Sequence, residues 1–243
     1  MSWEPFSLHF KQAYDGGYRY LDRCGQLMLR AEEVLHLMPE DANPNGCKMA
    51  LPESGITVGL GPSELAVTQE FASDCGAKFI DVCEVMSKLA LELFEPRSVE
   101  SNGLASKTYW GTGSSDAALA ASLQMVGVGP AELAGVVDMP ARQGRVDCHF
   151  AAGSMDLHFQ VYPVTFQSLT VQRFTAPPLA TAAHRRRVER LNQRADRIDP
   201  SLRQGIMMEL DLIEFEPPAG PLVKLFEELQ RKERGLQERF GIK

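Results

Sequence analysis

The sequence predicts an α+β protein in which long amphipathic helices cover one or more antiparallel β-sheets. Three observations lead to this prediction. Several short segments alternate apolar and polar residues, which is the pattern of strands with one buried face. Other segments place apolar residues every three or four positions, which is the pattern of an amphipathic helix. Strand-like and helix-like segments do not alternate regularly, so a parallel doubly wound sheet is not expected.

Residues 55–95 carry the clearest of these signals. Two alternating segments are interrupted by Gly61-Pro62-Ser63, which predicts a β-hairpin. A helical pattern follows, and we expect Ser73 or Asp74 to cap its first turn with a side-chain oxygen. Pro96 ends this helix, because proline disfavours helical geometry in the residue before it.

The remaining elements follow from the same two periodicities and from turn residues. The expected elements are a short edge strand at 5–10, a helix at 18–38, a surface loop at 40–46, a strand at 97–110, a helix at 117–126 capped by Ser114 or Ser115, an antiparallel meander at 131–175, a polar helix at 179–197, a strand at 206–215 and a last helix after Pro221.

Strands followed by a long helix occur twice, at 55–95 and at 135–240, so a two-fold pseudo-repeat of strands and helix is a further hypothesis. We expect a single α+β domain over residues 1–243. The alternative is a division into two subdomains, 1–127 and 128–243. The chain is long enough to bury a core in either arrangement.

Composition and the cysteine pattern predict a cytoplasmic protein. Apolar residues make up 44% of the chain and charged residues 23%, which is ordinary for a folded protein. No apolar run approaches the roughly 20 residues that cross a bilayer. The N-terminus lacks the basic and then apolar order of a signal peptide. The five cysteines are scattered without a Cys-x-x-Cys pair, as expected for reduced thiols.

The main candidate for chemistry is a group of histidines and aspartates in one predicted hairpin. A turn centred on Ala152-Gly153 would set Asp147 across from His158. The same turn would set His149 across from Asp156. Alternation places all four side chains on the polar face, where two imidazoles and two carboxylates could bind a divalent metal or act as an acid–base pair. The alternative is a solvated sheet face, where opposite charges pair for about 0.2–1 kcal/mol each.

A second candidate is the arginine-rich helix at 184–197. Helical spacings of three and four bring four guanidinium groups near one another. These belong to Arg186, Arg190, Arg194 and Arg197. Guanidinium groups fit phosphates and acidic protein surfaces. Two acidic residues dilute the patch, no aromatic residues are interleaved with it, and the net charge of the chain is −7, so nucleic-acid binding is not the first expectation.

No phosphate-loop, Rossmann, nucleophile-elbow or zinc-protease motif is complete, so no cofactor is expected. We therefore predict a protein-binding or assembly module, whose partner is another protein or a second copy of the chain. The arginine-rich helix and the last helix are its expected contact surfaces, and no membrane is involved. One alternative is a metal-assisted hydrolase or acid–base enzyme that uses the histidines and aspartates of the 146–161 hairpin. A third is nucleic-acid binding through residues 184–197.

Overall fold

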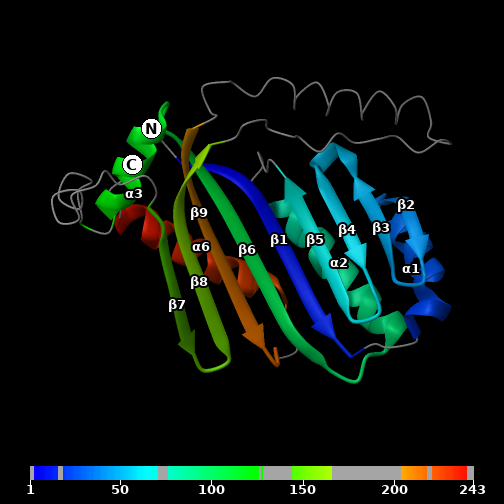
Figure 1. Ribbon diagram of the computed structural model, residues 1–243. Helices are drawn as coiled ribbons and strands as arrows, with labels where there is room; N and C mark the ends of the chain where they lie inside the picture. The colour runs from blue at the N-terminus through cyan, green and yellow to red at the C-terminus, as the bar shows by residue number, and fades with distance from the viewer. Residues whose placement is uncertain are drawn as a thin grey trace.

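The computed structural model describes residues 3–15, 19–70, 76–125, 127, 144–165, 204–217 and 221–239. Within this part of the chain, one nine-stranded antiparallel sheet and four α-helices form an α+β fold (Figure 1). The strand order across the sheet is β2-β3-β4-β5-β1-β6-β9-β8-β7.

The strands and helices have the following bounds. The strands are β1 (Glu4–Tyr14), β2 (Met38–Asn43), β3 (Gly46–Leu51), β4 (Ile56–Leu60), β5 (Glu64–Glu70), β6 (Val99–Gly111), β7 (Val146–Ala152), β8 (Met155–Thr165) and β9 (Gln204–Phe215). The helices are α1 (Arg19–Leu35), α2 (Ala77–Phe94), α3 (Ser115–Met125) and α6 (Val223–Arg239), and a short 3-10 turn spans Pro52–Ser54.

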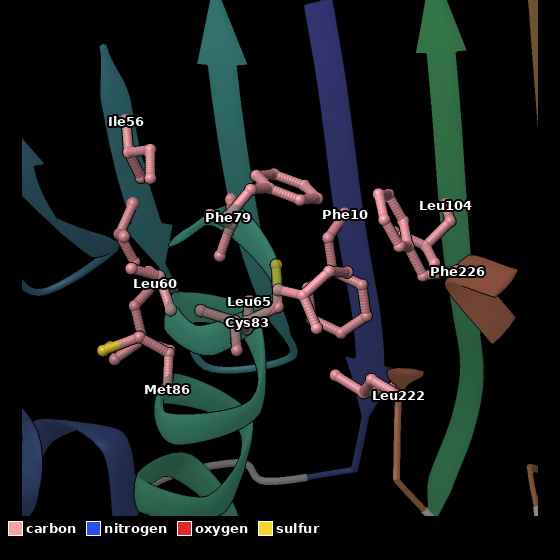
Figure 2. Packing of buried hydrophobic residues seen from close by; sticks show 14 of the residues in the cluster. Phe10, Ile56, Leu60, Leu65, Phe79, Cys83, Met86, Leu104, Leu222 and Phe226 are labelled. Atoms are coloured by element: carbon pink, nitrogen blue, oxygen red, sulfur yellow. The ribbon is translucent and has the colours of Figure 1, made fainter. Parts of the chain in front are cut away.

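One face of the sheet is buried against helices. Phe10 of β1 and Leu104 of β6 lie in the same apolar core as Phe79 of α2 and Phe226 of α6 (Figure 2). Each of these four side chains is at most 8% exposed. Because successive side chains of a strand point to opposite faces, the neighbours of these core residues in the strands lie on the other face of the sheet.

Three buried polar side chains on the helix side are bonded to one another. Gln12 of β1 donates from Nε2 to Asn102 Oδ1 of β6 at 2.9 Å, and Ser87 Oγ of α2 donates to Gln12 Oε1 at 3.0 Å. All three residues are buried. A buried amide without partners would cost about 1–3 kcal/mol, so this chain of bonds allows a polar residue in the middle of the core.

Two sequence-based expectations about the sheet are wrong. The segment at 5–10 is not a short edge strand, since β1 continues to Tyr14 and pairs with β5 on one side and β6 on the other. The sequence pattern does not show this continuation, because Gln12 is a polar residue at a position that points into the core. The expected loop at 40–46 is instead the β2–β3 hairpin, where the Asn43 side chain accepts from the Asn45 backbone N–H at 2.9 Å. Proline and acidic residues are tolerated in β2 because it is an edge strand.

Several other expectations are confirmed. The predicted hairpin is β4–β5, formed by residues 56–60 and 64–70, and α2 ends before Pro96. Ser114 caps α3, since its Oγ accepts from the Ala117 backbone N–H at 3.1 Å. The proposed caps Ser73 and Asp74 lie outside the described residues. The subdomain division and the pseudo-repeat stay predictions.

The end of the meander and the polar helix, 166–175 and 179–197, also lie outside the described residues. None of the helices in the described ranges is both long and apolar enough to cross a membrane.

Gly205 of β9 provides a test of the pairing between β6 and β9. A Cβ there would collide with the backbone carbonyl of Trp110 and lie 2.6 Å from the Tyr109 hydroxyl. We expect Gly205→Ala to lower the free energy of unfolding by roughly 1–3 kcal/mol, the usual cost of overpacking. Gly59→Ala in β4 is the control, because its Cβ would meet no atom within 4 Å. Urea unfolding curves measure both variants, and equal midpoints would contradict the assigned packing.

Candidate functional site

A pocket of about 280 Å³ opens on the polar face of the sheet, above strands β1, β6, β9 and β8. Its charged and polar lining residues come from all four strands. They are His9, Ser106, Lys107, His158, Gln160, Glu209 and Asp211.

The strand register builds this pocket. His9 of β1 is the pairing partner of Ala105 in β6, which is in turn paired with Asp211 of β9. Asp211 is paired with His158 of β8, so the four residues form one row across the sheet. Ala105 is the only small side chain of this row and leaves space between the larger ones. The next row on the same face contains Lys107, Glu209 and Gln160.

His158 is held by Asp147 of β7. His158 Nε2 lies 2.6 Å from Asp147 Oδ1, and the Gln160 amide nitrogen lies 3.3 Å from His158 Nδ1. A carboxylate only accepts hydrogen bonds, so Nε2 carries the proton that joins the ring to Asp147. The hydrogen bond from His158 lowers the pKa of Asp147, and the nearby charge of Arg145 lowers it further. Asp147 is therefore a fixed negative charge that orients the imidazole.

Glu209 is satisfied by two donors. Lys107 forms an ion pair with its carboxylate, and the Tyr162 hydroxyl donates to Oε1 at 2.9 Å. Burial, together with the bond to Glu209, raises the pKa of Tyr162 above its ordinary value. Tyr162 therefore keeps its proton and stabilises the charge of Glu209.

Asp211 lies in a different environment. Burial is the main cause that raises its pKa, and the negative charge of Glu209 adds to it, while His158 acts in the opposite direction. His9, on the other side of the pocket, has its pKa lowered by burial and by Lys107. Its ring lies 2.9 Å from Ser7 Oγ and 3.2 Å from Thr68 Oγ1. His9 is thus a neutral, positioned imidazole.

The predicted register of the 146–161 hairpin is wrong by two residues. The turn lies at Gly153-Ser154, where Gly153 has a φ of +61°, instead of at Ala152-Gly153. Gly at the first position of a two-residue turn allows this positive φ. Asp147 therefore pairs with Gln160, and His149 pairs with His158. A shift of two residues keeps the same face, because the side-chain period of a strand is two.

The predicted side chains still meet, through diagonal contacts. Besides the bond from His158 to Asp147, His149 Nε2 lies 3.7 Å from Asp156 Oδ2. Of the four residues predicted from the hairpin, only His158 is a lining residue of the pocket. The His149 side chain is 65% exposed on the edge strand, so a direct role for it in the pocket of a single chain has no support. The catalytic roles assigned to all four residues stay predictions.

Sequence reasoning missed the other half of the site. His9, Lys107, Glu209 and Asp211 each occupy a polar position of an alternating strand, but only the strand order brings them together. No group of three or more His, Cys, Asp or Glu side chains in the described ranges is placed to hold a metal ion. The candidate arginines Arg186, Arg190, Arg194 and Arg197 lie outside the described residues.

Comparison with known proteins adds no family assignment, since no family model matches the chain and no curated protein matches its sequence.

The raised pKa of Asp211 predicts a pH-dependent stability difference. Above its ordinary pKa of 3.8, the unfolded chain ionises this carboxyl more readily than the folded chain, so ionisation destabilises the fold. We expect Asp211→Asn to raise the Tm at neutral pH, and this gain to disappear as the pH falls below about 4. Calorimetry of both proteins across this range measures the difference. A gain in Tm that is the same at neutral pH and below pH 4 would contradict the raised pKa of Asp211.

Proposed function

We propose that the pocket binds a small polar molecule and that His158 exchanges a proton with it. The observation that carries the proposal is the 2.6 Å bond between His158 and Asp147 at the edge of the pocket. An imidazole that is oriented by a carboxylate and borders a ligand site is a common arrangement for general acid–base chemistry. Since Nε2 carries the proton bound to Asp147, Nδ1 is the nitrogen available to accept one.

Asp211 is the proposed second proton-exchanging group. It faces His158 across the β8–β9 pair, and burial raises its pKa. A carboxyl group whose pKa is raised by burial in a pocket is a typical candidate for a proton-exchanging residue. We assign His158 the role of base and Asp211 that of acid in the same pocket.

The charge of the lining indicates the class of ligand. The Lys107 ammonium is paired with Glu209, and no lysine or arginine of the described residues is paired with Asp211, which faces the pocket. A molecule that is neutral or positively charged and rich in hydrogen-bond donors, such as a polyol or an amine, fits this surface better than an anion does. Its donors would bond to Asp211 and Glu209.

Protein binding stays a second proposal. The arginine-rich helix expected at 184–197 falls outside the described residues, so it adds no support. The last helix, α6, buries Leu225, Phe226 and Leu229 within the chain, so these side chains are not free to meet a partner. The observation that favours a partner is instead the exposed edge strand β7. A cytoplasmic location also stays a proposal.

Ligand-observed NMR with a panel of polyols, sugars and small amines tests the pocket. We expect binders whose affinity falls about tenfold or more in His158→Ala, since a lost charge-assisted hydrogen bond is worth about 1.5–3 kcal/mol. Ala105→Leu should abolish binding by filling the pocket without removing a polar group.

Ala66→Leu is the matched control for this experiment. Ala66 lies on the same face of the sheet, paired with Lys11 in β1, and is not a lining residue of the pocket. This variant should bind like the wild type. A panel without binders, or binding that survives Ala105→Leu, would refute the proposal.

A further inference from the structure

The two edges of the sheet differ in how they are protected. β2 carries Pro39, Glu40 and Asp41, and proline and charged residues on an edge discourage pairing with another chain. β7, at the opposite edge, contains no proline and no lysine (Figure 1). It is the last strand of the described sheet, and five of its seven residues are exposed. No strand of the described residues pairs with its outer backbone groups.

We propose that β7 pairs antiparallel with β7 of a second copy of the chain, about a two-fold axis at Cys148. In this register, Asp147 of each copy lies opposite the partner's His149. Val146 of each copy lies opposite the partner's Phe150. A carboxylate and an imidazole thus face each other on the polar side of the sheet, and apolar side chains face each other on the helix side.

The neighbouring two-fold registers are less favourable. An axis at Asp147 would set this carboxylate against its own copy, and like charges directly opposite each other are destabilising. An axis at His149 would set the two imidazoles against each other and leave Asp147 opposite Ala151. Only the axis at Cys148 pairs the acidic residue with a histidine on both sides.

An exposed aromatic residue supports the same register. Phe150 is 55% exposed, although Val146 and Cys148 on the same face of β7 pack against the core. The partner's Val146 would cover part of this ring. Exposed apolar side chains at an edge strand that lacks proline and lysine are a typical feature of strand-to-strand association.

Dimerisation would add a residue to the pocket region. Asp147 holds His158 through Oδ1, and its Oδ2 lies 3.2 Å from the Arg145 guanidinium. The partner's His149 would approach this same carboxylate from beyond the β7 edge of the sheet. The pairing does not depend on the proposed ligand, because it can form with an empty pocket. The size of the protein in solution tests the pairing of β7 strands. Ligand NMR tests the proposed function independently.

Sedimentation velocity over a range of protein concentrations tests for the dimer. Two short strands bury less than the roughly 1,600 Å² of a standard interface, so we expect a monomer–dimer equilibrium that shifts with concentration. Phe150→Lys should shift the equilibrium to the monomer, because it places a charge on the edge and removes the apolar contact. Leu29→Lys is the matched control, since Leu29 is 64% exposed on α1, a helix that contacts β2 at the opposite edge of the sheet from β7. A chain that is monomeric at every concentration, or a dimer that survives Phe150→Lys, would overturn the proposal.

Two further variants test the register. Directly opposite residues of antiparallel strands have Cα atoms about 4.5–5.5 Å apart, which is within the range of a disulfide. Oxidation with diamide should therefore link the dimer through Cys148. Cys148→Ser should lose this link, and Cys24→Ser, at another partly exposed thiol, should keep it.

The charge pair gives an independent readout of the register. His149→Asp should weaken the dimer, because it sets two carboxylates opposite each other. Adding Asp147→His to this variant should restore the dimer, because a carboxylate and an imidazole again face each other. A dimer that is not linked through Cys148, or that the charge exchange does not rescue, would exclude the proposed register.

Discussion

The pairing of β6 with β9 is the constraint on which the rest of the structure depends. It runs without a break from Ser101 and Phe215 to Gly111 and Gly205, and it joins segments that are far apart in the sequence. A slip by one residue would turn every side chain of β9 to the other face. Leu210 and Leu212 would then leave the core, at a cost of about 1.5–3 kcal/mol for each. The apolar face of β9 therefore fixes the position of Asp211, although Asp211 itself contributes nothing to the core.

The polar face of the sheet carries charged side chains that do not contribute to the apolar core. Lys107, Glu209 and Tyr162 satisfy one another, as is usual for half-buried charged groups. Asp211 is different, because burial opposes its ionisation and no arginine or lysine is bonded to it in the described part of the chain. Groups kept in such an environment occur most often at functional sites. The unfavourable burial of Asp211 is thus a physical reason to assign the proposed proton exchange to the pocket and not to the exposed edge strand at His149.

The sequence predicted most of the helices and strands but missed β2 and β3, and it was insufficient for strand order. Alternation located β4, β5, β8 and β9, because each buries one face. The contact between Asp147 and His158 was also predicted, although the register was wrong by two residues, since such a shift keeps both side chains on the same face. His9 could not be predicted to join them, because its pairing with Ala105 depends on β1 lying in the middle of the sheet. The central position of β1 was not evident from the sequence, because Gln12 places a polar amide where a central strand usually has an apolar side chain.

Asp147 connects the pocket to the edge of the sheet. Its carboxylate orients His158 inside the pocket, yet it stands on the outermost strand, where its position depends on only one neighbouring strand. An edge strand that is paired on one side frays more easily than a central strand does, because half of its backbone hydrogen bonds are missing. Pairing with a second β7 would supply those bonds and would hold the Asp147 carboxylate between His158 and the partner's His149. Association of two chains would then stabilise the orientation of the proposed base without any change in the pocket itself.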